Sequence, residues 1–523
     1  MWYTTAAQIF PHRRRMKNEQ TPTRGPEVLP APDSDADENQ RLREFGYTPK
    51  LDRSIGRMSS FAIGFACISA TTAVFSSFQA GYFAAGGPFV WTMLLALLVF
   101  GLWAFIAADL AAKMPLAGYA YQWTSRINGS NLGWFTGFIA IIGWISATTS
   151  VAYTFAGYIG YVFGWQQSPT EQVLTTVVVI AACTLIVAYG VRLTTFLNNI
   201  GVGLEIVVTV GATLVVAGVA LLVPENHQPF SVLFTAPGTD DPTPFIIIWL
   251  VAALGPFFGM IGVEASADVA EETKNARRVI PKTMFYALIA SFVIELTMYI
   301  VYVLAIKDPE AVANATGFPI GEILSGQLGP VFSKIIIAVA LTNIFACLLT
   351  DVLLATRLIY SLSRDNMLPF SRRLRHVAPR RKSPTTAVMA VGIVAILLTL
   401  SALFSTETFF YFLGVCNLSF FAVYILQTSG LIIGMKNNRI PAAEKGTFDL
   451  GRWRLPLYII SLIFFVVIEA GLVLLPQFAG NGWVFLGVVG VAGLWWLFVL
   501  RGRLAKGDAG PMYAANHPEE FAD

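Results

Sequence analysis

Five carboxylates lie inside apolar runs of the sequence, where an ionised side chain is costly and is therefore a candidate for carrying a proton or binding a cation. They are Glu205, Glu264, Glu295, Asp351 and Glu469. Glu264 follows the pair Gly259 and Gly262 in LGPFFGMIGVEAS, and Glu205 follows polar residues in LNNIGVGLEIVV. We favour a functional role for these two. Glu295 and Glu469 have no polar neighbours in sequence, and a structural role is expected for them.

Two apolar runs are interrupted in the middle by small or polar residues. The first reads ISATTAVFSSFQAGYFAAGGP, from residue 68, and the sixth contains the glycine pair before Glu264. A helix broken inside a membrane leaves amide N–H groups unpaired at one new end and carbonyl groups at the other. Together the breaks predict a receptor for a zwitterion, with its carboxylate on the amides of residues 72–74 and its ammonium on the carbonyls of residues 257–259. The alternative for each break is close helix packing through small residues.

The composition places most of the chain in a bilayer. Only 13% of the 523 residues are charged, and the mean hydropathy is +0.63, whereas soluble domains carry about 25% charged residues. Apolar runs of about 20 residues, long enough to span a bilayer, predict an all-α polytopic membrane protein with twelve spans. They fall near 58–84, 88–112, 131–164, 171–190, 195–223, 243–268, 281–306, 331–360, 384–404, 406–433, 455–476 and 481–501.

The basic residues predict the orientation of these spans. If both termini are cytoplasmic, 33 of the 35 Lys and Arg residues fall in cytoplasmic segments, as the positive-inside rule requires. Glu271 and Glu272, beside Lys274, Arg277 and Arg278, are expected to form ion pairs that anchor a cytoplasmic loop. We expect a disordered tail at 1–55, a transmembrane domain at 56–502 and a second tail at 503–523.

Several other classes of protein have little support in the sequence. The four cysteines all lie in apolar runs, and no cluster of His and Cys falls at membrane depth, so we expect no disulfide framework, metal site or cofactor. No catalytic constellation indicates a membrane enzyme. A channel would need a continuous polar pore, whereas the polar residues gather at two breaks.

Four motifs, in order along the chain, resemble signatures of the amino acid–polyamine–organocation permeases. They are ADLAAKMPLAGYAYQW, FFGMIGVEASADVAEETKNARRVIP, RLIYSLSRDNMLPF and FDLGRWRLPL. The last is similar to that of the amino acid/choline branch, which includes GABA and choline permeases. The resemblance covers residues 55 to 500 and implies a LeuT-like bundle of five plus five inverted-repeat helices with two additional C-terminal helices.

The resemblance also implies which residues bind substrate. Carried onto this chain, they are Ser69, Thr71, Thr72, Ala73, Val74, Phe75, Phe257, Phe258, Gly259, Met260, Ile261 and Gly262. In related basic-amino-acid antiporters a gating aromatic stands at the position of Phe258, and an acid implicated in proton coupling stands at that of Glu264. Several proton-coupled members have Lys where this chain has Glu205, and the reversed charge favours a cationic or amine-bearing substrate.

We therefore expect a secondary active transporter of amino acids or related amines, GABA-like or cationic, working as a proton-coupled symporter or as an exchanger by alternating access. Glu264 and Glu205 are the candidates for sensing protonation. The expected partners are a small-molecule substrate, the proton and the lipid bilayer, with no nucleic acid, and the expected location is the plasma membrane. A choline, polyamine or other organic-cation permease is the alternative, with Phe75, Phe257 and Phe258 in an aromatic cage. A nutrient sensor with the same fold, which does not transport, is a further alternative.

Overall fold

The computed structural model describes residues 35–223, 226–238, 243–314, 319–404, 408–475 and 480–521, and these residues fold as helices joined by short connections. Their β pairing is confined to two isolated bridges, Ile55 with Thr273 and Ala378 with Ser383. Within these ranges, eleven helical stretches are long and apolar enough to cross a membrane. The predicted fold class, an all-α polytopic membrane protein, is confirmed.

Five of these eleven spans consist of a single helix, and the other six are divided into two or three elements. In chain order they are α2 (Arg57–Cys67) with α3 (Ala70–Ala85), η1 (Gly87–Trp91) with α4 (Thr92–Lys113), α6 (Ser130–Phe163), α7 (Pro169–Tyr189), α8 (Val191–Leu204) with η2 (Glu205–Thr209) and α9 (Val210–Leu222), α10 (Phe245–Ala252) with α11 (Leu254–Met260) and α12 (Ala265–Asp268), α13 (Ala276–Leu304), α16 (Pro330–Arg364), α19 (Thr408–Lys436), η6 (Gly451–Trp453) with α20 (Arg454–Leu474), and α21 (Asn481–Trp495) with η8 (Trp496–Leu500) and α22 (Arg501–Lys506). The predicted ninth span corresponds to α18 (Thr385–Ser401), which has only 17 residues.

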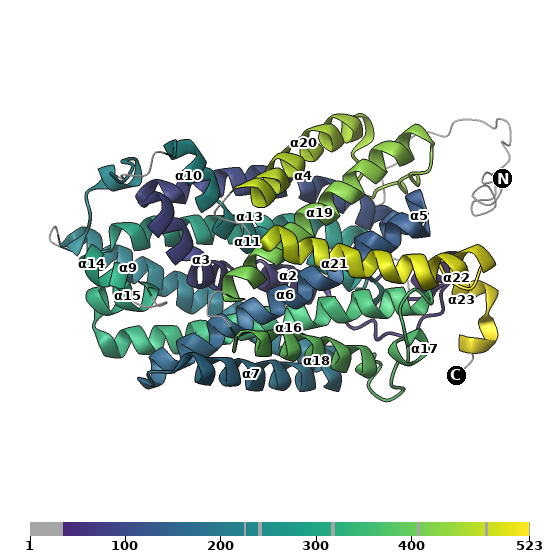
Figure 1. Ribbon diagram of the computed structural model, residues 1–523, viewed down its shortest axis with the longest axis horizontal. Helices are drawn as coiled ribbons and strands as arrows, with labels where there is room; N and C mark the ends of the chain where they lie inside the picture. Colours follow the sequence, from purple (N-terminus) through teal and green to yellow (C-terminus); the bar gives the residue numbers. More distant parts are fainter. Residues whose placement is uncertain are drawn as a thin grey trace, which may run out of the picture.

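The spans run side by side along the long axis of one bundle (Figure 1). The most apolar part of the first span and of α6 is 83% buried by protein, whereas for the last two spans the buried share is 22% and 11%. The first span and α6 therefore lie in the centre, and α20 and α21 lie on the outside with apolar side chains toward lipid. This position agrees with their prediction as two helices added to the ten-helix bundle.

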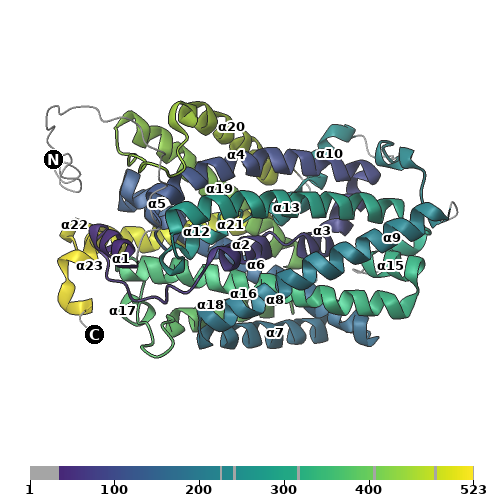
Figure 2. The same ribbon diagram turned by 180° about the vertical axis from the view of Figure 1, so that it is seen from behind.

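One end of the bundle, which we call the terminal face, contains α1 (Asp35–Glu44), α5 (Tyr119–Asn128), α17 (Ser371–Leu374), α22 and α23 (Tyr513–Asn516) (Figure 2). The helices α14 (Pro309–Asn314) and α15 (Pro319–Leu328) lie at the opposite end (Figure 1). The terminal face is the end for which the basic residues predict a cytoplasmic location.

The first span is broken between α2 and α3. The helix α2 ends at Cys67, and Ile68 leaves the helical conformation with φ −95° and ψ 42°. Ser69 is extended, with φ −61° and ψ 117°, and its side chain accepts a hydrogen bond from the Thr72 amide as the N-cap of α3. The polar residues that interrupt the apolar run thus start a new helix inside the bundle.

The sixth span is broken at Ile261 to Glu264. Ile261 is extended, with φ −60° and ψ 134°, and Gly262 has φ +91°, a conformation that residues with a Cβ rarely adopt. A Cβ on Gly262 would also lie 2.4 Å from the Cys67 sulfur and 2.7 Å from the Trp144 ring. Both the backbone angle and the space around it therefore require glycine at this point.

Residues 35–55 differ from the expected disordered tail. They form α1 and a segment that packs on the terminal face, where Tyr47 and Ile55 are each 1% exposed. Residues 503–521 are folded as well, and the Gly510 amide donates to the carbonyl of Asp365. Residues 1–34 lie outside the described residues. The apolar side chains at Leu42, Tyr47 and Ile55 explain the difference, because burying them stabilises the segment against the bundle.

Gly259→Ala is expected to lower the melting temperature of the purified protein. A Cβ on Gly259 would lie 2.5 Å from the Cβ of Ala73 and 2.8 Å from a carboxylate oxygen of Glu295, and overpacking of this kind costs about 1–3 kcal/mol. Gly203→Ala, in α8 with no atom within 4 Å of the new Cβ, is the matched control and should be neutral or stabilising. Equal melting temperatures for the two variants would contradict the close contact of α11 with α3.

Candidate functional site

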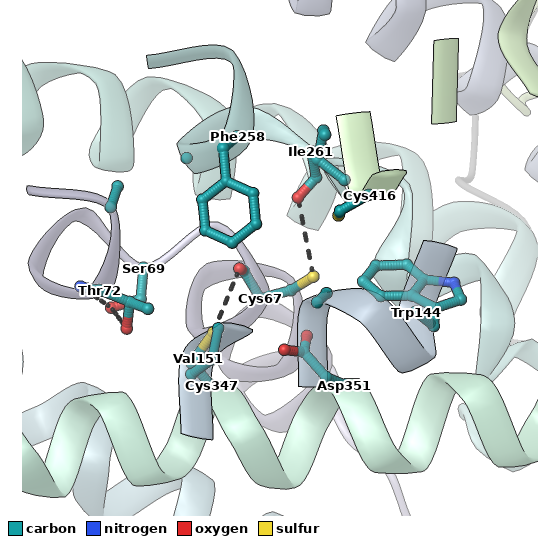
Figure 3. A pocket seen from close by; sticks show the side chains of 13 residues that line it. Cys67, Ser69, Thr72, Trp144, Val151, Phe258, Ile261, Cys347, Asp351 and Cys416 are labelled. Carbon is teal, nitrogen blue, oxygen red and sulfur yellow. Dashed lines mark hydrogen bonds between the residues drawn. The ribbon is translucent and has the colours of Figure 1, made fainter. Parts of the chain in front are cut away.

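The two breaks meet at one cavity inside the bundle (Figure 3). Its walls come from the first and sixth spans, α6, α16 and α19, through Cys67, Ser69, Thr72, Ala73, Trp144, Ala147, Val151, Phe258, Gly259, Ile261, Cys347, Asp351 and Cys416. The volume of this cavity is only about 20 Å³. That is room for one or two water molecules, so a larger molecule fits only after the walls move.

The cavity is lined by half of the predicted substrate-binding residues. Six of them form its walls: Ser69, Thr72, Ala73, Phe258, Gly259 and Ile261. The other six are buried next to it: Thr71, Val74, Phe75, Phe257, Met260 and Gly262. The Phe75 ring, for example, packs on Tyr158 with 4.9 Å between centroids. Substrate binding stays a prediction for all twelve.

The amide groups at the start of α3 already have partners in this conformation. The Thr71 amide donates to a carboxylate oxygen of Glu205 at 2.9 Å, and the Ser69 hydroxyl donates to the same oxygen at 3.0 Å. The Thr72 amide donates to the Ser69 hydroxyl at 3.2 Å, and the Ala73 amide donates to the Ser69 carbonyl. The positive end of the α3 dipole is thus occupied by a carboxylate of the protein itself.

Glu205 reaches this position from a distorted part of the fifth span. It begins the π-helical turn η2, where the Val210 amide donates to the Glu205 carbonyl. A π-helical turn inserts an extra residue into the helix and is often found at functional sites. Glu205 is 1% exposed and lies outside the cavity wall, one hydrogen bond behind Ser69.

At the carbonyl end of the sixth-span break, the Ile261 amide donates to the carbonyl groups of Phe257 and Phe258. The Ile261 carbonyl accepts a weak bond from the Cys67 thiol at 3.9 Å. Phe258 and Ile261 both line the cavity, but the Phe258 carbonyl already accepts from the Ile261 amide. The Ile261 carbonyl, which has only the weak bond from Cys67, is therefore the one available for a stronger donor such as an ammonium group.

The two neighbouring phenylalanines point in different directions. The Phe258 ring points into the cavity (Figure 3). The Phe257 ring packs against Phe100 and Phe421, with centroid distances of 6.2 and 5.7 Å. Phe258 is therefore the one of the pair that is placed to cover a molecule in the cavity.

Glu264 lies outside the cavity and is held by three aromatic donors. Its carboxylate accepts hydrogen bonds from Tyr119 at 2.6 Å, Trp103 at 3.0 Å and Tyr424 at 3.1 Å. These donors come from α5, α4 and α19, and Glu264 itself is fully buried. The acid after the sixth-span break thus ties the break to three other helices.

Sequence reasoning did not identify Cys67, Trp144, Ala147, Val151, Cys347, Asp351 or Cys416 as wall residues. The residues contributed by α6 are spaced by three and four, as on one face of a helix. This spacing could have indicated that they face the same side. Cys347 and Asp351 are four apart on α16. The sequence of that helix shows no break, so nothing indicated that Asp351 lies near the breaks of the first and sixth spans.

The terminal face is closed by buried ion pairs between the sixth span and α16. Arg357 binds Glu272, with 3.0 Å between one nitrogen–oxygen pair, and Arg364 binds Glu271 through two contacts of 2.9 Å. All four side chains are buried. The expected partners were the neighbouring basic residues, but the structure pairs both acids with arginines of α16, about 90 residues away in the sequence.

A second buried cluster on this face centres on Asp365. The hydroxyl of Tyr121 donates to its carboxylate at 2.7 Å, and that of Tyr47 at 2.8 and 2.9 Å. Burial raises the pKa of Asp365 to about 6, although Arg364 and the two donated hydrogen bonds act to lower this pKa. The N-terminal segment is thereby fixed to the end of α16.

Comparisons with known proteins agree with this arrangement. The family model described as amino acid permease matches residues 55–498. Among curated relatives, Amino-acid permease 2 of Neurospora crassa is 25% identical over 84% of this chain and 82% of its own length. The branched-chain amino acid permease BcaP of Bacillus subtilis is 24% identical, over 84% and 92%. The thiamine transporter thi9 of Schizosaccharomyces pombe is 24% identical, over 82% and 79%.

The match of the family model to most of the chain shows that this protein belongs to the amino acid permease family, within the amino acid–polyamine–organocation superfamily. It is an integral, multi-pass membrane transporter rather than an enzyme.

Acidification is expected to strengthen closure of the terminal face. The pKa of Asp365 is about 6 when the face is closed and about 3.9 once the carboxyl is exposed to water, so the closed arrangement binds the proton more tightly. The stabilisation of the closed face by this proton is complete below about pH 4, decreases as the pH rises from about 4 to 6, and is absent above about pH 6. Hydrogen–deuterium exchange of residues 45–55, corrected for the intrinsic pH dependence, measures it.

In Asp365→Asn the opening free energy of this segment should no longer change between pH 5 and pH 7.5. A wild-type protein with the same opening free energy at both pH values would contradict the assignment.

Proposed function

We propose that this permease is a secondary active transporter that moves amino acids or related amines across the plasma membrane by alternating access. The observation that supports this best is the meeting of two broken membrane spans at a small cavity inside the bundle. Broken spans at a cavity provide unpaired backbone groups for a polar substrate at membrane depth. Amino acids, branched-chain amino acids and thiamine, named for three relatives, are all small molecules with amino groups.

The movement follows from the position of the sixth-span break. Gly262 lies between the cavity on one side and Glu271 and Glu272 on the other. Rotation of the segment after Gly262 would separate these acids from Arg357 and Arg364 and open the terminal face toward the cavity. A movement of the segment before Gly262, which carries Phe258 and Ile261 in the cavity wall, would give the volume that a substrate needs.

Glu205 is our first candidate for proton coupling. While its carboxylate is ionised, it competes with a substrate carboxylate for the amides at the start of α3. Proton uptake by Glu205 weakens its hold on Thr71 and frees the donor for substrate. Substrate and proton would then bind to the same conformation, as a symporter requires.

Glu264 is the second candidate, because its three hydrogen bonds connect the break to α4, α5 and α19. A protonated carboxyl accepts hydrogen bonds less strongly than a carboxylate does. Proton uptake at Glu264 would therefore loosen the break from its neighbours.

One observation favours the alternative of an organic cation without a carboxylate. Of the amides that were expected to bind the substrate carboxylate, those of Thr72 and Ala73 are satisfied by Ser69, and Glu205 occupies the preceding Thr71 amide. A substrate such as choline or a polyamine needs no donor at this end. The name of the thiamine transporter among the relatives is consistent with such a substrate.

Proteoliposomes with the full chain test the proposed function. Radiolabelled leucine, alanine, lysine, GABA and choline are supplied with and without an inward pH gradient. We expect saturable uptake of at least one amino acid, reduced by an excess of the same unlabelled amino acid. Uptake of choline alone would favour the alternative, and the absence of saturable uptake of any compound would contradict a transport function for amino acids and amines.

Glu205→Gln is expected to abolish the response of uptake to the pH gradient while leaving some uptake without a gradient, because the amide side chain still accepts from Thr71 but cannot gain or lose the proton. Glu469→Gln, which also neutralises a carboxylate inside an apolar helix but lies on α20 away from the cavity, should respond like the wild type. An unchanged gradient response in Glu205→Gln would remove Glu205 from the coupling mechanism.

A further inference from the structure

Asp351 is the one charged side chain in the wall of the cavity. It lies on α16, is 2% exposed, and its side chain rises from that helix to lie below Cys67 in the view of Figure 3. Figure 3 also shows Ile261 on the opposite side of Cys67. The Asp351 carboxylate and the Ile261 carbonyl therefore lie on either side of the Cys67 side chain, and both residues line the cavity.

No described cation neutralises this carboxylate. Its Oδ2 atom is buried without a hydrogen-bond partner, and the described part of the chain places no Lys, Arg or His in the cavity wall. Arg357 follows six residues later on α16, about 9 Å along the helix axis, and is bound to Glu272. A buried carboxylate without a partner costs free energy that an arriving cation can recover.

The two carboxylates proposed for proton coupling are satisfied by protein donors. Glu205 accepts from Thr71 and Ser69, and Glu264 accepts from three aromatic side chains. Glu205 also occupies the Thr71 amide at the start of α3, where an anion would otherwise be held. The walls of the cavity thus offer a carboxylate and a backbone carbonyl to a ligand, together with the rings of Phe258 and Trp144, and aromatic rings also attract cations.

We propose that Asp351 binds a positively charged group of the substrate and makes the cavity selective for molecules with net positive charge, either a basic amino acid or an amine without a carboxylate. This inference rests on the proposed function, since it assigns the substrate charge at the same cavity. In a basic amino acid the α-ammonium lies at the Ile261 carbonyl and the side-chain cation lies at Asp351. In a diamine the two ammonium groups occupy the same two positions.

Ligand-induced thermal stabilisation of the purified full chain tests the selectivity. Lysine, 1,5-diaminopentane, choline and leucine are each added to the wild type, and a ligand that binds the folded protein raises its melting temperature. We expect stabilisation by lysine or by one of the two amines and none by leucine. Stabilisation by lysine would indicate a basic amino acid as the substrate, whereas stabilisation by diaminopentane or choline would indicate an amine without a carboxylate.

Asp351→Asn is expected to weaken binding of the cation by about 10- to 100-fold, the range typical of hydrogen bonds to charged groups. Asp351→Glu keeps the charge and should retain the preference for cations, while Glu469→Gln is the matched control for loss of a membrane carboxylate elsewhere. Stabilisation of the wild type by leucine, with the same affinity in Asp351→Asn, would overturn the inference and leave the permease function intact.

The thiols of Cys67, Cys347 and Cys416 in the cavity wall give a second measurement that does not need the substrate. In a Cys183→Ala background, which removes the one cysteine outside the wall, the thiols react with a positively or a negatively charged methanethiosulfonate reagent, and mass spectrometry follows both rates. We expect the ratio of the cationic to the anionic rate to exceed the same ratio for a free thiol in solution by about 10-fold, and to fall toward the free-thiol ratio in Asp351→Asn. A ratio no higher than that of the free thiol would overturn the inference. A normal ratio together with failure of every uptake assay would overturn only the proposed function.

Discussion

The hydrogen bonds that Glu205 accepts at the start of α3 are the interaction on which the broken first span depends. A break in mid-membrane frees backbone donors, and lipid offers nothing to satisfy them. Glu205 satisfies the Thr71 amide and fixes the Ser69 hydroxyl, which in turn caps α3 through Thr72. The fifth span widens into a π-helical turn where this carboxylate leaves it. The distortion of one span therefore stabilises the interruption of another, and the cavity lies beside their junction.

Small residues then determine how close the two broken spans come. Gly259 allows α11 to contact Ala73 on α3, and Gly262 allows the chain to pass Cys67 and Trp144. Because these contacts leave little free volume, the cavity is small in this conformation. The carbonyl of Ile261 and the carboxylate of Asp351 are nevertheless kept in its wall, where a polar ligand can replace weak or absent partners.

The sequence was informative where a physical constraint is local and uninformative where two distant segments meet. A long apolar run can only be a span, and glycine before a carboxylate inside such a run indicates a break, so the positions of both breaks were predictable. Nothing local shows that Glu271 meets Arg364 or that Asp351 faces the cavity, because both depend on how α16 packs. The charged composition before residue 55 suggested disorder, whereas single apolar anchors such as Tyr47 decide that this segment is ordered.

Helix α16 connects the cavity with the terminal face as one rigid element. It contributes Asp351 to the cavity wall and, six and thirteen residues later, the arginines that bind Glu272 and Glu271. These sites lie within about 20 Å along one unbroken helix, and the acids they bind belong to the segment beyond the Gly262 hinge. A ligand that draws Asp351 toward Ile261 therefore acts on both sides of the same hinge. Because a ligand shifts a conformational equilibrium only through its different affinity for the two states, a cation bound at Asp351 would favour opening of the terminal face only if it is held more tightly when that face is open.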